Sequence, residues 1–287
     1  MIRNLQDKIR IAEGVEMPGF GLGLYKAKAG DEVYSAVRMA LDAGYRHIDT
    51  ATFYENEADV GRAVKDSGIP REELFVATKL WPTDFQKAQE TFEKSLSYLN
   101  TGYIDLYMLH WPGTDETLRY RAWDVILGLR EKGLIRAAGV SNFIADQLAD
   151  MKRKTGEFPA NNQVELHPWF QQRELRSFCR QNGISVTAWG PIFHGHLSEE
   201  PLMEEIGGHY GKSAAQATLR WHIQNEIAVI PKSVHRERIA SNADVFDFEL
   251  SQEDIERINA LDGKQRFSWD STKFDGDAEK ARKNSHK

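Results

Sequence analysis

An acid, a phenol, a lysine and a histidine each lie at or just beyond the end of an extended hydrophobic run in this sequence. Asp49 ends a short run and Tyr54 follows it by five residues, while Lys79 and His110 come near the ends of two longer apolar runs. A lysine buried at such a position needs an acidic partner, and Asp49 is the natural one. Singly, Asp49 can cap a turn and Tyr54 can pack as an ordinary ring. Together the four predict a functional site.

The composition is that of a soluble globular protein. Of its 287 residues, 41% are hydrophobic and 28% are charged, which is enough to bury a large core. The formal net charge is -6, so we expect neither nucleic acid nor an anionic membrane as a partner. The length fits one large α/β domain or two ordinary ones.

The cysteine count and the start of the chain indicate a cytoplasmic protein. The single cysteine, Cys179, excludes an intrachain disulfide and fits a reducing compartment. It falls in a predicted helix, where we expect a buried structural thiol. Residues 1–10 are polar and cannot be a secretory signal, and no apolar run approaches the length of a membrane span.

Strand and helix signals alternate along most of the chain. The predicted strands cover residues 19–25, 47–49, 74–80, 104–110, 135–140, 162–165, 184–188 and 227–230. The helices that follow them cover residues 31–43, 57–66, 84–99, 116–131, 145–154, 173–181, 214–224 and 236–242. Eight such units with short connections predict an α/β fold, a closed (β/α)8 TIM barrel, in a single domain over residues 1–287.

A doubly wound open sheet is the alternative fold. It would normally carry a glycine-rich phosphate turn after its first strand, but the glycines of residues 19–23 lack the Gly-x-Gly-x-x-Gly spacing. Glycines in a strand more often allow a close backbone approach. We therefore favour the barrel.

Three segments lie outside the repeating units. Residues 8–17 predict a hairpin before the barrel, and residues 252–260 an extra helix after it. The polar tail, residues 262–287, carries Phe267, Trp269 and Phe274, so we expect it to pack across the barrel mouth. Residues 279–287 are expected to fray.

The polar candidates converge on one end of this barrel. The C-terminal strand ends of a closed barrel form one rim, where chemistry is found. At these ends, or just beyond them, lie Asp49, Tyr54, Lys79, His110, Ser141, Asn142 and Gln163. We therefore predict the site at that rim.

Several motifs, in order along nearly the whole chain, resemble the aldo-keto reductase superfamily. They are GYRHIDTA at 44–51, TKLW at 78–81, LYMLHWP at 106–112, GVSN at 139–142, QVELHP at 163–168 and IPKS at 230–233. Within the superfamily the chain is most similar to bacterial 2,5-diketo-D-gluconate and methylglyoxal reductases. The resemblance implies NADPH-dependent reduction of aldehydes and ketones, with small dicarbonyls and keto-sugars as substrates.

The family's catalytic tetrad falls on Asp49, Tyr54, Lys79 and His110, with none substituted. By this resemblance Tyr54 is the proton donor to the carbonyl oxygen. Lys79 is expected to lower the pKa of the phenol, and Asp49 to hold Lys79 charged. His110 is expected to orient the carbonyl by a hydrogen bond.

The resemblance also implies NADPH as cofactor. Ser141, Asn142 and Gln163 match the residues that bind the nicotinamide carboxamide, and Trp189 matches the ring on which nicotinamide stacks, commonly a tyrosine. The adenosine 2′-phosphate is expected on Lys232, Ser233 and Arg238 at a helix start. Ser241 departs from the family, because that position is often acidic in relatives. The other expected contacts are Gly23, Tyr25, Asp49, Gly190, Pro191, Val234 and Asn242.

The expected substrate pocket is aromatic. Its residues are Tyr25, Tyr54, Trp81, His110 and Trp111. No metal site is expected, because His194 and His196 lack a third ligand nearby. The family expectation for the oligomeric state is a monomer.

Two other functions stay open at this point. A nicotinamide-binding regulatory subunit with little turnover would retain the same tetrad. A barrel aldolase would use Lys79 as a Schiff base, although the neighbouring Asp49 should keep that amine protonated.

Overall fold

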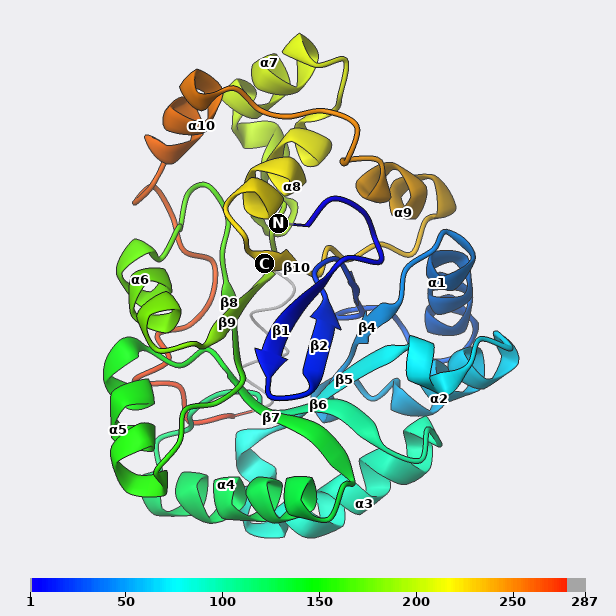
Figure 1. Ribbon diagram of the computed structural model, residues 1–287, viewed down its shortest axis with the longest axis vertical. Helices are drawn as coiled ribbons and strands as arrows, with labels where there is room; N and C mark the ends of the chain where they lie inside the picture. Colours follow the sequence, from blue (N-terminus) through cyan, green and yellow to red (C-terminus); the bar gives the residue numbers. More distant parts are fainter. Residues whose placement is uncertain (1, 278–287) are drawn as a thin grey trace.

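Eight parallel strands form a closed barrel in the computed structural model, which describes residues 2–277 (Figure 1). They are β3 (Leu22–Gly23), β4 (His47–Asp49), β5 (Phe75–Leu80), β6 (Ile104–Leu109), β7 (Ile135–Ser141), β8 (Asn161–Glu165), β9 (Ser185–Trp189) and β10 (Ala228–Val229). The strands pair in chain order, and parallel bridges join Phe20 to Val229 and Gly23 to Lys232. The predicted (β/α)8 barrel is confirmed, and the doubly wound alternative is wrong.

Glycines at the first strand allow it to close the barrel. A Cβ atom on Gly23 would lie 2.6 Å from the backbone oxygen of Ile230, so only glycine fits there. The amide of Gly21 donates a hydrogen bond to Val229 O at 2.8 Å across the same join. The expected close backbone approach is confirmed, although only residues 22–23 of the predicted strand form a regular ladder.

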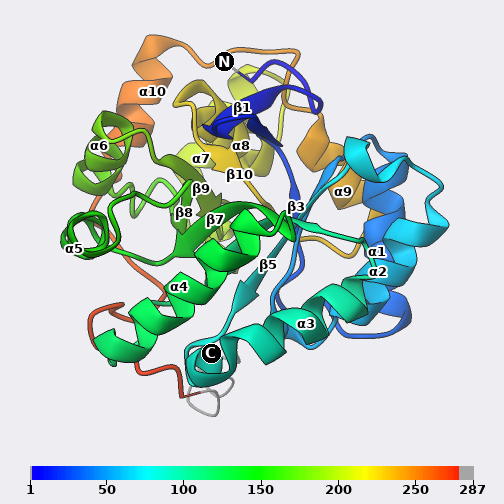
Figure 2. The ribbon, with the colours of Figure 1, turned by 60° about the horizontal axis from the view of Figure 1, so that its bottom comes forward.

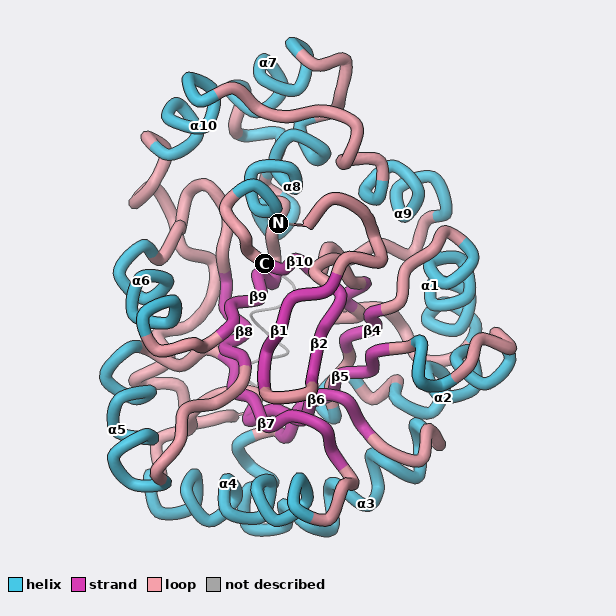
Figure 3. Tube along the Cα trace, in the orientation of Figure 1, coloured by secondary structure: helices cyan, strands magenta, loops and turns pink. Residues whose placement is uncertain are grey.

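Helices surround the barrel (Figure 3). They are α1 (Asp31–Asp42), α2 (Glu57–Asp66), α3 (Ala88–Leu99), α4 (Glu116–Glu131), α5 (Ala145–Thr155), α6 (Arg173–Gln181), α7 (Pro201–His209), α8 (Ala214–Gln224), α9 (Arg236–Ala243) and α10 (Gln252–Asn259). Within residues 2–277, no helix combines the length and the apolar composition needed to span a membrane.

Helix α7 was not predicted. It lies between the seventh predicted strand, residues 184–188, and the next predicted helix, residues 214–224. Pro201 occupies the first helical turn, where its missing N–H costs nothing, and the Glu200 side chain accepts a hydrogen bond there. Gly207 and Gly208 weaken the helical pattern, but Gly207 is needed because a Cβ atom would lie 2.7 Å from Lys212 O.

The helix predicted over residues 84–99 begins differently. Residues Pro82–Lys87 form a 3-10 helix, and the α-helix starts only at Ala88. Lys87 has φ -115° and ψ 27°, outside the helical region, which separates the two segments.

Alternation along the strands divides residues between the barrel interior and the helix-facing side. In β5, Phe75 and Ala77 belong to the interior cluster, whereas Val76 and Leu80 pack with the helices. Lys79 shares the parity of Phe75 and Ala77 and therefore points into the barrel.

The predicted N-terminal hairpin is present, and it fills one end of the barrel. It consists of β1 (Lys8–Ala12) and β2 (Val15–Pro18), which lie across the barrel in Figure 1. Its buried residues Ile11, Val15 and Met17 pack against the interior cluster of the strands. This end is therefore apolar and closed.

The C-terminal tail lies at the opposite end (Figure 2). The indole nitrogen Nε1 of Trp81, just after β5, donates a hydrogen bond to Gly276 O at 2.7 Å. The predicted extra helix is α10, and the predicted course of the tail over the mouth is confirmed. The residues expected to fray, 279–287, lie outside the described part of the chain.

Candidate active site

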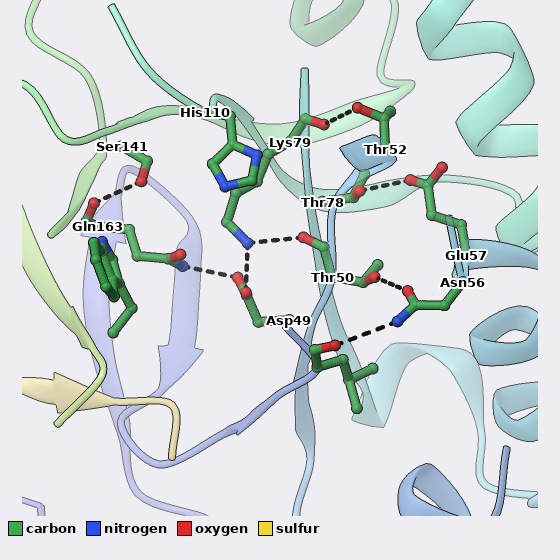
Figure 4. A network of polar contacts seen from close by, with 12 residues as sticks. Asp49, Thr50, Thr52, Asn56, Glu57, Thr78, Lys79, His110, Ser141 and Gln163 are labelled. Carbon is green, nitrogen blue, oxygen red and sulfur yellow. Dashed lines mark hydrogen bonds and ion pairs between the residues drawn. The ribbon is translucent and has the colours of Figure 1, made fainter. Parts of the chain in front are cut away.

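The strand ends gather the predicted catalytic side chains on the inner side of one rim (Figure 4). Asp49 ends β4, Lys79 lies near the end of β5, and His110 directly follows β6. Tyr54 comes from a 3-10 turn, Thr52–Tyr54, that follows β4. The Tyr54 ring lies 5.6 Å from the His110 ring and 5.1 Å from Lys79 Nζ. Four residues from separate motifs are thus adjacent.

Lys79 and Asp49 form a buried ion pair. Lys79 Nζ donates to Asp49 Oδ1 at 2.5 Å and to Thr50 O at 2.8 Å. The other carboxylate oxygen of Asp49 accepts a hydrogen bond from Gln163 Nε2 at 2.8 Å. Burial lowers the pKa of Lys79, and the charge of Asp49 opposes that shift. An ammonium, a carboxylate and an amide therefore fix one another beside the Tyr54 ring.

The buried acid Glu57 binds the residue that precedes Lys79, and the sequence did not identify it as part of the site. Its buried carboxylate accepts hydrogen bonds from Thr78 Oγ1 at 2.6 Å and Ser95 Oγ at 3.2 Å. Burial raises its pKa, against these hydrogen bonds and the charge of Lys79. The sequence offered only an acid in the first turn of a helix, which is usually explained by the helix dipole.

Asn56 is a second supporting residue that the sequence did not reveal. It precedes α2 in the position of a cap, yet its side chain does not cap the helix. Its oxygen accepts a hydrogen bond from Thr50 Oγ1 at 2.6 Å, and its amide donates to Leu24 O at 3.3 Å and Ala27 O at 3.2 Å. Asn56 therefore ties the loop after β3 to the end of β4.

The Tyr54 phenol stays protonated. Burial raises its pKa well above the usual value, and the charges of Asp49 and Tyr25 add to the shift. The expected net lowering of this pKa is therefore not found, because burial, the largest cause of the shift, outweighs any stabilisation of the phenolate by Lys79.

His110 is a neutral imidazole. Burial lowers its pKa well below the usual value, and the charge of Lys79 lowers it further. Its Nδ1 atom is buried and has no hydrogen-bond partner among the described residues. The other ring nitrogen, Nε2, is the one that a ligand could reach and, when it carries the proton, the one that could donate a hydrogen bond.

The polar residues at the ends of β7, β8 and β9 form one hydrogen-bond network. Ser141 Oγ donates to Gln163 O at 2.7 Å, and Asn142 Nδ2 donates to Ser141 Oγ and to His110 O, both at 3.0 Å. Trp189 Nε1 donates to Asn142 Oδ1 at 3.0 Å. The structure thus brings together all four residues that the sequence placed here.

Three lysine and arginine side chains lie around the join between the first and last strands. Lys232 and Arg238 were predicted, and Lys26, beside Tyr25, was not. Burial lowers the pKa of Lys26 and the Lys232 charge lowers it further. Burial also lowers the pKa of Lys232, with Arg238 adding to this and Glu32 opposing it. All three side chains are exposed, so they could bind an anion together.

Helix α9 begins next to these cations. The side chain of its N-cap residue, His235, makes no capping hydrogen bond. Two more predicted contacts are buried: Ser233 just before this helix start, and Asn242 in the last turn of α9. Val234 is half-buried. Backbone N–H groups without a side-chain cap, next to three cations, suit a phosphate group.

Aromatic rings cover the tetrad. Trp81 lies 4.9 Å from the His110 ring, and Phe53 stacks on Trp81 at 4.0 Å. Trp111 contacts Phe274 of the tail at 4.9 Å. Of the predicted pocket residues, Trp81 therefore lies beside the tetrad, and Trp111 packs with the tail. The other predicted ring, Tyr25, lies 5.2 Å from the Tyr54 ring.

Comparison with protein families identifies the chain. The model of the Aldo/keto reductase family matches residues 19–263. The chain belongs to the aldo/keto reductase family.

Relatives of known activity are similar to this aldo-keto reductase over nearly their full length. The glyoxal reductase of Bacillus subtilis is 44% identical over 269 residues, covering 93% of this chain and 96% of the relative. The methylglyoxal reductase DkgA of Salmonella typhimurium is 40% identical over 270 residues, covering 93% and 98%.

Solved structures agree with the fold of this aldo-keto reductase. An aldo/keto reductase from Brucella melitensis is 43% identical, with a TM-score of 0.86, covering 89% of this chain and 99% of the other. A Bombyx mori aldo-keto reductase, solved in complex with NADP, is 34% identical, with a TM-score of 0.83, covering 91% and 94%.

The histidines after β9 of this aldo-keto reductase contact an acid and an aromatic ring. His196 Nδ1 lies 2.7 Å from a carboxylate oxygen of Glu199, and the His196 ring stacks on Phe267 of the tail at 4.5 Å. In the part of the chain that the structure describes, no group of three His, Cys, Asp or Glu side chains could hold a metal ion.

Proposed function

We propose that this aldo-keto reductase uses NADPH to reduce small aldehydes, α-dicarbonyls and keto-sugars to alcohols. The observation that carries the proposal is the buried ion pair of Lys79 with Asp49, 2.5 Å apart, beside the Tyr54 ring and close to a neutral His110. It supplies a proton donor and a hydrogen-bond donor at one place. Both are needed where a carbonyl oxygen becomes an alcohol.

Tyr54 acts as the proton donor in this proposal. Its raised pKa keeps the phenol protonated until negative charge develops on the carbonyl oxygen. The Lys79 ammonium, 5.1 Å from the ring centre, stabilises the phenolate that remains. Asp49 and Thr50 O hold the ammonium in position, so little reorganisation is needed.

His110 orients the substrate. A neutral imidazole whose Nε2 carries the proton donates one hydrogen bond to the carbonyl oxygen. The hydrogen bond fixes the carbonyl beside Tyr54, and the ring contact of 4.9 Å with Trp81 holds the imidazole. The aromatic cover excludes water from the same space.

The chain fits NADPH, which when bound supplies the hydride. Ser141, Asn142 and Gln163, which share one hydrogen-bond network, are proposed to bind the carboxamide, and the half-exposed Trp189 at the end of β9 is proposed to stack on the nicotinamide. The remaining proposed contacts at this end are Gly23, Tyr25, Asp49, Gly190 and Pro191. The uncapped start of α9 and its cations suit the 2′-phosphate, with Ser233 and Val234 just before it, and Asn242 is proposed to contact the adenine. Two or more cations near one dianion favour NADPH over NADH.

The substrate class rests on the pocket and on the relatives. Trp81 and Trp111 are both nearly fully buried, with Phe274 packed against them, and this close aromatic packing favours a small carbonyl compound as substrate. The relatives named above act on glyoxal and methylglyoxal. We propose α-dicarbonyls of this size first, and 2,5-diketo-D-gluconate as a larger candidate.

Loss of NADPH absorbance tests the proposal. We would measure it with methylglyoxal, an aromatic aldehyde and 2,5-diketo-D-gluconate, for the wild type and for Tyr54→Phe. Removing the hydroxyl should lower kcat by about 100-fold or more, because general acid catalysis contributes about 10²–10⁴. Tyr25→Phe is the matched control, since it removes a phenol from the neighbouring ring.

Two outcomes would contradict the proposal. Full activity of Tyr54→Phe would exclude this residue as the proton donor. NADPH binding without turnover of any carbonyl compound would favour the regulatory subunit instead.

We also propose that the protein acts as a cytoplasmic monomer with one domain over residues 1–287. Sedimentation at several concentrations tests the monomer, because a dimer would change its apparent mass with dilution.

A further inference from the structure

Glu165 lies at the same rim as the tetrad, yet the chemistry proposed above does not use it. It ends β8, two residues after Gln163, and its side chain is 1% exposed. A buried carboxylate is costly unless hydrogen bonds compensate it. We therefore asked which groups its two oxygen atoms bind.

The partners of Glu165 come from the tail. Its Oε1 accepts a hydrogen bond from the Phe267 backbone N–H at 2.7 Å, and its Oε2 accepts one from Ser268 N–H at 2.8 Å. His167 Nε2 lies 3.0 Å from the same Oε1. Burial alone would raise the pKa of Glu165, but these hydrogen bonds outweigh it and hold the pKa below its usual range. The group is therefore a carboxylate at neutral pH.

These hydrogen bonds hold the tail where it enters the mouth of the barrel. A cavity of about 100 Å³ lies beside them, lined by residues that include Glu165, Arg266 and Ser268. The Phe267 ring also packs here, with its centre 5.2 Å from that of His167 and 6.1 Å from that of Trp169. The position of the tail at this point therefore depends on this packing together with the carboxylate of Glu165.

The aromatic residues of the tail come directly after Ser268 in the chain. Trp269 is the residue after Ser268, and its ring stacks on Phe274 at 4.7 Å. Phe274 lies 5.8 Å from Trp81 and 4.9 Å from Trp111. A shift of the chain at residues 267–268 would therefore move the rings that cover the pocket.

Phe267 also connects the tail to the loop after β9. The Phe267 ring stacks on His196 at 4.5 Å with an interplanar angle of 9°. His194 in turn lies 6.0 Å from the ring of Trp189. The tail is thus connected to both sides of the mouth.

We propose that Glu165 is a positioning residue for substrate binding, which fixes the tail at residues 267–268 so that Trp269 and Phe274 close the pocket. It touches neither the reacting atoms nor the tetrad. This inference rests on the carbonyl reduction proposed above. Its consequence is that Glu165 sets KM, most of all for bulky carbonyl substrates, and leaves kcat nearly unchanged.

Glu165→Gln tests the inference in the full-length protein. In glutamine, an N–H₂ group replaces one acceptor oxygen of the carboxylate. This group faces a backbone N–H of the tail and cannot accept its hydrogen bond, so one hydrogen bond to the tail is lost. We expect KM for an aromatic aldehyde to rise about tenfold, as the loss of one charge-assisted hydrogen bond predicts, with kcat within about twofold. Glu199→Gln is the matched control, because Glu199 binds His196 and not the tail.

A double mutant separates positioning from a general effect on the fold. If Glu165 acts through the tail, Glu165→Gln should add little to the KM change caused by Phe274→Ala. Additive changes would show that Glu165 acts elsewhere and would overturn the inference.

Limited trypsin digestion gives a readout that does not need activity. The tail contains Lys264, Arg266 and Lys273 as cleavage sites. We expect mass spectrometry to show faster cleavage at these sites in Glu165→Gln than in the wild type and Glu199→Gln. Equal cleavage rates and an unchanged KM would contradict the inference, whereas an inactive wild type would contradict the proposed reduction alone.

Discussion

The buried ion pair of Lys79 and Asp49 makes the same two residues important for both stability and catalysis. Lys79→Met would leave Asp49 buried without its partner. We expect the free energy of unfolding to fall by about 3–5 kcal/mol and turnover to be lost. Urea unfolding and NADPH oxidation measure the two effects.

The double mutant Lys79→Met/Asp49→Asn is the control. Because it leaves no unpaired charge, most of the stability should return while turnover does not. If Lys79→Met alone were as stable as the wild type, the ion pair would not be compensating a buried charge.

The shifted pKa values of Tyr54 and His110 predict a flat pH profile for reduction. The raised pKa of Tyr54 keeps the proton on the phenol, and the lowered pKa of His110 keeps the imidazole neutral. We expect kcat/KM to vary less than about threefold from about pH 6 to about pH 9. Initial rates across this range measure it, and a step near the usual histidine pKa that disappears in His110→Asn would contradict it.

At the scale of residues, the sequence revealed those that end strands. Asp49, Lys79 and His110 are polar groups after apolar runs, a pattern that the barrel rim explains. Glu57 and Glu165 could not be found in this way. Glu57 binds Thr78, 21 residues away, and the tail partners of Glu165 lie 102 and 103 residues away, so no local pattern connects these acids to those groups.

Among the elements, the first strand has little room for a side chain at Gly23, because its backbone lies against the last strand. In Gly23→Ala the new Cβ atom would meet Ile230 O, a backbone atom that cannot move aside easily. We expect the free energy of unfolding to fall by about 1–3 kcal/mol, as for other overpacked sites. Chemical denaturation measures the change.

Gly128→Ala in α4 is the matched control. An added Cβ atom there meets no atom of the described residues within 4 Å. The free energy of unfolding should rise by about 0.5–1 kcal/mol, since alanine favours a helix over glycine. A loss of stability at Gly23 no larger than the change at Gly128 would contradict the close contact.

Elements whose hydrophobic residues recur with a helical period could be predicted from the sequence, whereas elements that depend on backbone geometry could not. The amphipathic helices α1, α2 and α4 match their predicted ranges closely. Helix α7 was missed because Pro201, Gly207 and Gly208 are all poor helix formers in isolation. The 3-10 start before α3 depends on the φ and ψ of Lys87, which the residue type does not fix.

Across the whole molecule, one end of the barrel contributes to stability, and the other end carries the candidate active site. Met17 of the hairpin is fully buried in the end opposite to the tetrad. Met17→Ala should lower the free energy of unfolding by about 2–5 kcal/mol, as other large-to-small core substitutions do. At a temperature well below unfolding, kcat and KM should stay within about twofold of the wild type.

Thermal unfolding and steady-state kinetics on the same preparation measure both quantities. A fall in kcat/KM of the folded protein comparable with that of a tetrad substitution would show that the two ends are coupled.

The join between the first strand and the last has a consequence for protein synthesis. Strand β10 leaves the ribosome long after β3, because nearly the whole barrel lies between them in the chain. Until then β3 has one unpaired edge, and Lys232 cannot yet approach Lys26. A nascent or truncated chain therefore lacks the proposed phosphate site. Nucleotide binding would distinguish finished chains from interrupted ones, and cellular NADPH would stabilise only the former.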